Sequence, residues 1–250
     1  MDKRQFECNR DGLTIRGKVY LKDENPRPAV VLCHGFLANM GMCRTYAKLL
    51  AELGYAAFIF DFCGGGLMSK SDGKSEEMSV LTEVQDLITV IKKIRTLPFV
   101  MQDKVSLLGC SQGGVVSAMV ARDRSMDIER LVLLYPALCI PDDARKGRML
   151  GFSFDPKNIP DILCRLPMRI GGDYARSVMD MDIYREIKGY EGPVLYLHGT
   201  EDRIVDISYA RKAGEVFPQR EYHEIQGAGH MFRGKADEEA CNLISRFMAQ

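Results

Sequence analysis

Residues 109–114 read GCSQGG, and they follow the apolar run VSLL. Two nucleophilic side chains, Cys110 and Ser111, stand next to each other in this stretch. A nucleophile at a sharp turn from a strand into a helix needs very small residues two places before it and two places after it, because larger side chains would collide with the strand and the helix. The positions of the glycines therefore decide which of the two side chains can occupy such a turn.

The glycine spacing fits the serine. Centred on Ser111, the two positions are Gly109 and Gly113, which gives the pattern G-x-S-x-G. Centred on Cys110, the same positions would hold a leucine and a glutamine. We therefore expect Ser111 to be the nucleophile at the apex of the turn, and Cys110 to pack beside the strand as unpaired cysteines commonly do.

Apolar runs and amphipathic stretches alternate on both sides of this turn. Runs that are apolar on both faces predict parallel strands covered by helices, and they lie at 29–33, 55–62, 105–109, 131–135 and 193–199. Helical patterns lie at 44–54, 79–95, after Ser111, around 209–217 and at 236–249. Two alternating stretches at 4–9 and 13–21 predict an N-terminal hairpin. The order predicts an α/β fold with a doubly wound, mostly parallel sheet.

One connection is much longer than a normal crossover. Residues 136–192, between the fourth and fifth of these central runs, contain several prolines and only short apolar stretches. We expect one domain over residues 1–250, with an inserted lid subdomain at 140–188 that covers the carboxyl edge of the sheet. The length of the chain suits one large domain better than two independent cores.

Composition limits the class of partner. Lys and Arg number 34, as do Asp and Glu, so no positive excess is present to bind nucleic acid or an anionic membrane. The N-terminal residues lack the apolar core of a signal peptide, and the eight cysteines are scattered, which predicts a cytoplasmic protein with reduced thiols. No zinc-binding motif occurs. We expect a small-molecule substrate, no metal, no nucleic acid and no membrane partner.

A serine hydroxyl needs a base, because it hardly ionises at neutral pH. His230 follows the flexible stretch QGAG between the last predicted strand and the last predicted helix, where a loop can carry it to the serine. The other three histidines lie in or at the end of predicted strands, where structural roles are the simpler interpretation: His34, His198 and His223. We expect His230 to be the base.

The base needs a carboxylate to hold its other ring nitrogen. The stretch LYLHGTEDRIVD, just past a buried strand, offers three acidic residues. Asp202 is our choice from its position in the loop, with Asp206 second and Glu201 third. Each of the three could instead belong to a solvated turn.

The oxyanion of an acyl-transfer intermediate needs two N–H donors. The backbone amide of Gln112 opens the helix after the turn, where unpaired amides and the helix dipole favour negative charge. The loop HGF at 34–36 follows the first central strand, and it places the backbone amide of Phe36 as the second donor.

Four motifs resemble the α/β-hydrolase superfamily in order and spacing over nearly the whole chain: HGF at 34–36, GCSQGG at 109–114, HGTED at 198–202 and GAGH at 227–230. Within it, the short Q-G-G after the serine and three further stretches are similar to bacterial feruloyl (cinnamoyl) esterases: KSDGK at 70–74, FDPKNIPD at 154–161 and GGDYAR at 171–176.

The resemblance implies a serine esterase that cleaves hydroxycinnamate esters through an acyl-enzyme beneath a small lid, without a cofactor. It implies the triad Ser111, Asp202 and His230, and it is compatible with a homodimer. In the insert, Tyr174 and Asp143 could bind the hydroxyls of a phenolic ring. The competing interpretation is a surface tyrosine and a helix-capping aspartate.

The chain departs from the pattern at two places. Cys110 stands where these esterases usually carry a histidine, which alters packing behind the serine. The loop at 61–73 has Gly65 in place of the histidine of a G-H-G motif, and about three extra residues before S-D-G. Because the Gly64–Gly66 stretch is expected near the edge of the active site, this change bears on substrate preference.

Other functions remain open on the same scaffold. The same triad serves thioesterases, lipid esterases, aminopeptidases and acyltransferases, and only the lid and the loop would separate them. A non-catalytic binding protein with a hydrolase fold is a further alternative.

Overall fold

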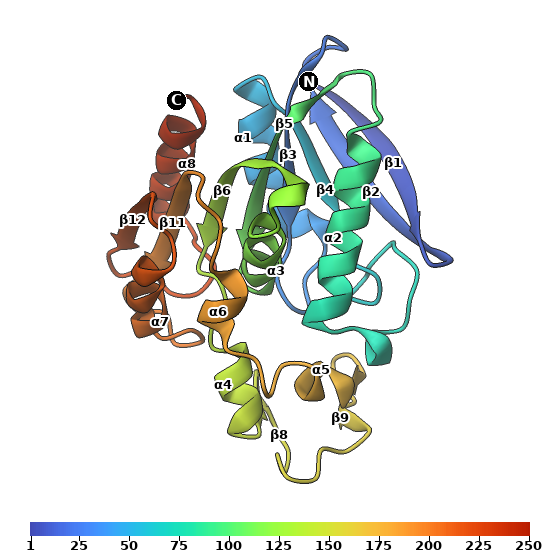
Figure 1. Cartoon of the computed structure of the whole chain (residues 1–250), viewed down its shortest axis with the longest axis vertical. Coiled ribbons are helices and arrows are strands. Elements are labelled where there is room, and N and C mark those ends of the chain that lie inside the picture. Colours follow the sequence, from blue (N-terminus) through green and yellow to red (C-terminus); the bar gives the residue numbers. More distant parts are fainter.

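A computed structural model describes all residues from Met1 to Gln250, and an eight-stranded sheet forms its centre (Figure 1). The spatial order of the strands is β1-β2-β4-β3-β5-β6-β11-β12. Their bounds are β1 (Asp2–Arg10), β2 (Leu13–Leu21), β3 (Arg27–Cys33), β4 (Ala56–Phe60), β5 (Val100–Cys110), β6 (Ile128–Leu134), β11 (Val194–Gly199) and β12 (Arg220–Ile225). The strands from β4 to β12 pair in parallel. The predicted doubly wound, mostly parallel α/β sheet is confirmed.

The N-terminal hairpin makes the antiparallel edge of the sheet. Strand β1 pairs with β2 from Asp2 opposite Leu21 to Arg10 opposite Leu13, which leaves a two-residue turn. Asp11 and Gly12 in this turn have φ values of 50° and 88°. Positive φ at both positions is what a tight hairpin turn requires, and Asp-Gly is among the favoured pairs.

Helices cover both faces of the sheet (Figure 1). The helices α2 (Val80–Ile94) and α3 (Gln112–Ala121) pack on one face, and α1 (Arg44–Glu52) and α8 (Lys235–Met248) pack on the other. Each face has its own hydrophobic core, as parallel strands with apolar residues on both faces require. None of the helices is both long enough and apolar enough to span a bilayer.

Local sequence signals explain where these helices begin and end. Ser79 is the N-cap of α2, and its hydroxyl accepts from the amide of Thr82 while the Thr82 side chain accepts from the Ser79 amide. Gly54 follows the end of α1 with a φ of 100°, a conformation that favours glycine.

Some boundaries differ from the sequence prediction. Strand β5 begins at Val100 rather than 105; residues 101–104 are exposed and three of the four are polar, so they carry no run of apolar residues. The helix expected around 209–217 is α7 (Ile207–Lys212), followed by a 3-10 turn at Ala213–Glu215. Asp206 is its N-cap and accepts from the amide of Ser208, so the helix starts two residues earlier than its apolar pattern indicated.

The connection between β6 and β11 contains several short elements beyond the carboxyl edge of the sheet (Figure 1). They are α4 (Ile140–Arg145), β7 (Arg148–Met149), β8 (Phe152–Ser153), β9 (Ile162–Cys164), β10 (Ile170–Gly171), α5 (Asp173–Arg176) and α6 (Ile183–Ile187). The pairs β7–β8 and β9–β10 are small antiparallel ribbons, and α6 returns the chain to the side of α3.

Candidate active site

Ser111 lies at the junction of β5 and α3 in a strained conformation. Its φ of 52° and ψ of −120° are rare for a residue with a side chain. The turn is held because the Ser111 amide donates to the carbonyl of Leu134 at 2.9 Å, and the Ser111 carbonyl accepts from Gly114 and Ala137. These contacts set the serine at the tip of a sharp strand-to-helix turn, as the G-x-S-x-G spacing predicted.

The two glycines of this motif have no room for a side chain. A Cβ on Gly109 would lie 2.3 Å from the carbonyl oxygen of Gly113. A Cβ on Gly113 would lie 2.4 Å from the carbonyl oxygen of His34 and 2.5 Å from that of Cys33. All these clashes are with backbone atoms, so a rotamer change could not relieve them.

We therefore expect Gly113→Ala to lower the free energy of unfolding by about 3 kcal/mol or more, because β3 and α3 must separate to admit a methyl group. Urea denaturation followed by circular dichroism measures this. Gly229→Ala is the matched control, since a Cβ there meets only the carbonyl oxygen of Glu201 at 3.8 Å. Equal unfolding free energies for the two variants would contradict the steric account of the turn.

A hydrogen-bonded relay connects the serine to the predicted base and acid. The Nε2 of His230 is 2.9 Å from the Oγ of Ser111, and its Nδ1 is 2.8 Å from Oδ2 of Asp202. Ser111 lies in the turn after β5, His230 in the loop after β12 and Asp202 in the loop after β11. The structure thus brings together side chains that are up to 119 residues apart.

Asp202 is fixed by its own loop. Its Oδ1 accepts from the amides of Ile204 and Val205, both at 2.9 Å. Burial alone would raise the pKa of the Asp202 carboxyl, but the hydrogen bonds from His230 and these two amides outweigh burial and lower the pKa. An ionised carboxylate at this position keeps a proton on Nδ1 of His230 and leaves Nε2 free to accept one from the serine.

The alternative acids lie elsewhere. Asp206 caps α7, and the Glu201 side chain is exposed. The other histidines form other hydrogen bonds: His34 Nε2 accepts from the amide of Phe62 at 3.2 Å, His198 Nε2 lies 2.9 Å from the carbonyl of Val205, and His223 Nε2 lies 2.8 Å from Glu221 Oε1. His198 Nε2 also lies 3.4 Å from Oδ2 of Asp202, so His198 packs beside the acid of the relay. None of these three histidines contacts Ser111.

The predicted oxyanion donors flank the serine. The backbone amides of Phe36 and Gln112 donate to no acceptor within the protein. The loop before Phe36 approaches the nucleophile closely, because a Cβ on Gly35 would lie 3.1 Å from the Cβ of Ser111. Two free amides beside a serine hydroxyl form the arrangement that stabilises a tetrahedral oxyanion.

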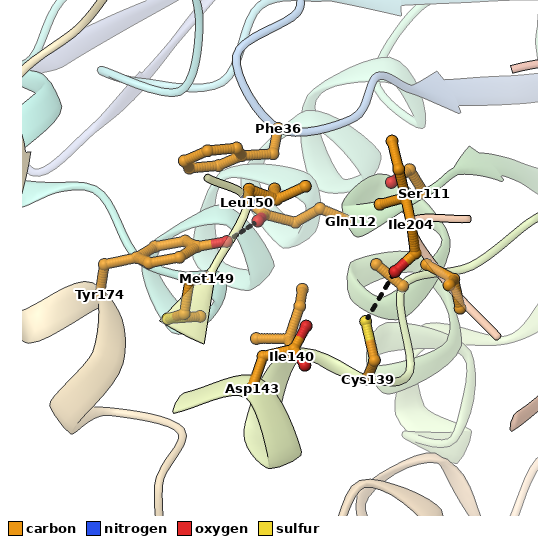
Figure 2. Close-up of a pocket in the computed structure, with 12 residues that line it drawn as sticks. Phe36, Ser111, Gln112, Cys139, Ile140, Asp143, Met149, Leu150, Tyr174 and Ile204 are labelled. Atoms are coloured by element: carbon orange, nitrogen blue, oxygen red, sulfur yellow. Dashed lines mark hydrogen bonds between the residues drawn. The ribbon is translucent and has the colours of Figure 1, made fainter. Parts of the chain in front are cut away.

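A narrow, mostly apolar pocket opens beside the serine (Figure 2). Its cavity volume is about 20 Å³, room for about one water molecule, so a larger group can enter only if the lining side chains move apart. Nine of its twelve lining residues are hydrophobic. In Figure 2, Ser111 and Tyr174 lie at opposite ends of the pocket, with Phe36 and Leu150 above and Asp143 below.

The sequence profile of the family described as "Serine aminopeptidase, S33" matches residues 24–170, more than half of the chain. The chain belongs to this family. It is a hydrolase with the α/β-hydrolase fold, of the esterase and lipase group, and the resemblance drawn from the four motifs is confirmed.

Two curated relatives are similar over nearly the whole chain. The sn-1-specific diacylglycerol lipase ABHD11 of Mus musculus is 24% identical over 260 residues, which cover 89% of this chain and 81% of the relative. The monoglyceride lipase of Rattus norvegicus is 22% identical over 272 residues, which cover 94% and 86%.

Solved structures share the fold. Est1E from Butyrivibrio proteoclasticus with ferulic acid bound has a TM-score of 0.89 and 27% identity, covering 97% of each chain. The α/β-hydrolase domain-containing protein 10 from mouse has a TM-score of 0.76 and 20% identity, covering 98% of each chain.

Two residues of the insert line the pocket of this hydrolase. Tyr174 is buried, not at the surface, because its ring packs on Phe36 with centroids 4.9 Å apart and its hydroxyl donates to Oε1 of Gln112 at 2.5 Å. Asp143 is half-buried in the first turn of α4, but the N-cap of that helix is Cys139 and no side chain caps it. Burial raises the pKa of the Asp143 carboxyl, against an opposing hydrogen bond from Cys139.

Cys110 is fully buried in the core on the α1 and α8 side of the sheet. It lies among the apolar side chains of that layer, beside Cys43. No group of three or more His, Cys, Asp or Glu side chains is arranged to hold a metal ion.

Sequence reasoning missed three contacts of the site. The ring of Tyr135 packs edge-on against His230 with centroids 4.8 Å apart, which holds the imidazole from one side. The Gln112 side chain bonds the insert through Tyr174, although only its backbone had been expected to act. Glu83, on α2, is buried near that side chain. The positive φ of Tyr135, at 40°, has no sequence signal.

The glycine-rich loop at 61–73 packs against the loop at 34–38 that carries the Phe36 amide. Leu37 and Gly66 form an isolated parallel bridge, and the Leu67 amide donates to the carbonyl of Leu37 at 3.2 Å. A Cβ on Gly66 would overlap the carbonyl of Ala38. The changed loop therefore supports the segment that carries the Phe36 amide.

Proposed function

We propose that the protein is a serine carboxylesterase that hydrolyses small aryl or hydroxycinnamate esters through an acyl-enzyme on Ser111. The observation that carries the proposal is the relay from Ser111 through His230 to Asp202, with both hydrogen bonds shorter than 3 Å, at the mouth of an apolar pocket. No cofactor takes part in this reaction.

In the first half of the reaction, Oγ of Ser111 attacks the ester carbonyl carbon while Nε2 of His230 takes the hydroxyl proton. The carbonyl oxygen becomes an oxyanion, and the amides of Phe36 and Gln112 donate to it. The bond to the alcohol oxygen then breaks, and His230 gives its proton to the leaving alcohol. Asp202 stabilises the imidazolium throughout.

In the second half, His230 takes a proton from water, and the resulting hydroxide attacks the acyl-enzyme carbonyl. The oxyanion forms again at the same two amides. When it collapses, the bond to Oγ breaks, Ser111 regains its proton from His230, and the carboxylic acid leaves.

The lining of the pocket supports an aromatic acid as the acyl group, which enters when the lining side chains move apart. Its walls are apolar, as an aromatic ring requires, and Asp143 is a polar group on one of them (Figure 2). A half-buried carboxylate is a strong acceptor for a phenolic hydroxyl. The structural relative Est1E carries ferulic acid, a hydroxycinnamate, in its solved structure. We further propose that residues 140–188 act as the lid, and that the enzyme works in the cytoplasm on a small ester as a monomer or homodimer.

Asp143→Ala should raise KM for a methyl ester of a 4-hydroxycinnamate by about tenfold or more, because the ring hydroxyl loses a charge-assisted hydrogen bond. KM for methyl cinnamate, which has no ring hydroxyl, should hardly change. Steady-state kinetics with the two esters measures the difference. An equal rise for both esters would contradict the assigned role of Asp143.

A substrate panel tests the proposed reaction against the alternatives. It contains hydroxycinnamate esters, short aryl esters, acyl thioesters, monoacylglycerols and aminoacyl amides at equal concentration. We expect the highest kcat/KM for the aryl and hydroxycinnamate esters. A higher value for monoacylglycerols would favour a lipid esterase like the two curated relatives, and a higher value for aminoacyl amides would favour an aminopeptidase. If no ester, thioester or amide is hydrolysed and Ser111 does not react with a phosphonate probe, the result would favour a non-catalytic binding protein.

A further inference from the structure

Buried polar side chains meet behind the oxyanion hole at Gln112. Its side chain is fully buried, and its Oε1 accepts from the hydroxyl of Tyr174 at 2.5 Å (Figure 2). Its Nε2 points to the sulfur of Met78 at 3.9 Å. The residue that offers its backbone amide to the oxyanion is therefore held by its side chain between the insert and the segment before α2.

Glu83 is the third polar group at this place. It lies in the first turn of α2, only 1% of it is exposed, and neither carboxyl oxygen has a hydrogen-bond partner of normal geometry. The Gln112 side chain lies close enough to this carboxyl to lower its pKa, against the larger effect of burial. Glu83 forms no ion pair, whereas Asp86, one turn along the same helix, pairs with Arg10.

Burial favours the neutral form of the Glu83 carboxyl. It raises the pKa well above the usual value; the Gln112 side chain opposes this, and the charge of Asp86 adds to it. The other titratable groups that face Glu83 are Cys33 on β3 and Tyr174 on α5, and neither is a cation. A protonated carboxyl has one donor and one acceptor, which is what the amide of a glutamine can use.

The loop at 61–73 lies against the Glu83 carboxyl. Gly65 encloses it, because a Cβ on Gly65 would lie 2.9 Å from Oε1 of Glu83 and 2.6 Å from the Cβ of Phe62. A buried carboxyl without a hydrogen-bond partner is unfavourable, because it has lost its contacts with water and gained none in the protein. The site therefore favours any small movement that brings the Glu83 and Gln112 side chains together.

We propose that Glu83 is a positioning residue that, together with Tyr174, fixes the Gln112 side chain and through it the direction of the Gln112 amide in the oxyanion hole. This inference rests on the proposed role of that amide. Gln112 is the first residue of α3, and its amide takes no part in the helical hydrogen-bond ladder. The orientation of the Gln112 amide therefore depends on the contacts of the Gln112 side chain as well as on the strained backbone of Ser111.

The arrangement also connects the insert to the reaction. Tyr174 comes from α5, and its only recorded hydroxyl bond is to Gln112. A displacement of the insert would pull on the same side chain that we propose Glu83 helps to fix. Substrates that displace Tyr174 should therefore alter the oxyanion hole as well as the pocket wall.

The test measures kcat and KM for 4-nitrophenyl acetate, together with the rate at which a fluorophosphonate labels Ser111. Glu83→Leu removes the polar group at similar volume. It should lower kcat and the labelling rate about tenfold or more at unchanged KM, because the oxyanion donor is misplaced while the pocket is intact. Glu83→Gln keeps a neutral donor and acceptor and should restore the rates. Gln85→Leu, exposed on the same helix, is the matched control.

Tyr174→Phe completes the test, and it serves alone if Glu83→Leu does not fold. It should lower kcat for 4-nitrophenyl acetate, and its effect should combine with that of Glu83→Leu less than additively, because both act through Gln112. A folded Glu83→Leu with wild-type rates, a Glu83→Gln as slow as Glu83→Leu, or a wild-type rate for Tyr174→Phe would overturn the inference. Failure of the wild-type protein to label at Ser111 would instead overturn the proposed function.

Discussion

Ser111→Ala should lower kcat for a short aryl ester by roughly 10⁵-fold to 10⁶-fold, while the protein stays folded. The alanine removes the only atom that can form the acyl-enzyme, and His230 and the oxyanion amides cannot replace it. Hydrolysis of 4-nitrophenyl acetate, followed by release of nitrophenol, measures the loss. Thermal unfolding checks that the strained turn tolerates the smaller side chain.

Cys110→Ala is the matched control for this prediction. The thiol is fully buried on the far side of the strand pleat, in the core beneath α1 and α8, and no substrate can reach it. We expect this variant to keep most of the activity and to lose a little stability from the small cavity. A dead Cys110→Ala with an active Ser111→Ala would contradict the assignment of the nucleophile.

Asp202→Asn should have the second largest effect, a loss of about 10⁴-fold in kcat. The carboxylate accepts from Nδ1 of His230 at 2.8 Å, and an amide in its place would favour the tautomer with the proton on the wrong nitrogen. The serine would then face an N–H instead of a base. KM for a short ester should change little, because Asp202 does not line the pocket.

The other two acids of the same loop provide the comparison. Asp206→Asn keeps a capping side chain on α7, and Glu201→Gln changes an exposed group, so both variants should retain activity. If Asp206→Asn lost activity as strongly as Asp202→Asn, the relay in the structure would not be the one used in the reaction.

Local patterns predicted the parts of the site that depend on local sterics. Positions 109 and 113 must be glycine because a Cβ there would clash with nearby backbone atoms, those of Gly113 and of the end of β3. The spacing of the two glycines therefore indicates the nucleophile between them. The parallel sheet was predictable for a similar reason, since strands covered on both faces read as apolar runs. His230 and Asp202 could be placed because loops at the carboxyl ends of such strands meet at one edge.

The residues that were missed depend on contacts between distant segments. Gln112 and Tyr174 are 62 residues apart, and no pattern in either segment indicates that the two side chains bond. Glu83 stands in the first turn of an amphipathic helix, where an acidic residue is usual and normally exposed. Its burial arises from the glycine-rich loop folding over it, which the sequence does not reveal.

The insert shows the same limit. Its prolines and short apolar stretches indicated a separate small unit, but they left open whether Tyr174 and Asp143 face the substrate or lie at the surface and cap a helix; in the structure both line the pocket. Those positions follow from how α4 and α5 pack against the edge of the sheet. Periodicity within six or four residues is too short to define a buried face.

The most direct test of the account is mass spectrometry of the protein quenched with acid during turnover of a 4-nitrophenyl ester, followed by peptide mapping. We predict one acyl group per chain, on the peptide that contains Ser111, and no adduct in Ser111→Ala. An acyl group on Cys110 would contradict the central claim that Ser111 forms the acyl-enzyme. Turnover without any covalent adduct, by a protein that does not react with a fluorophosphonate, would contradict it as well.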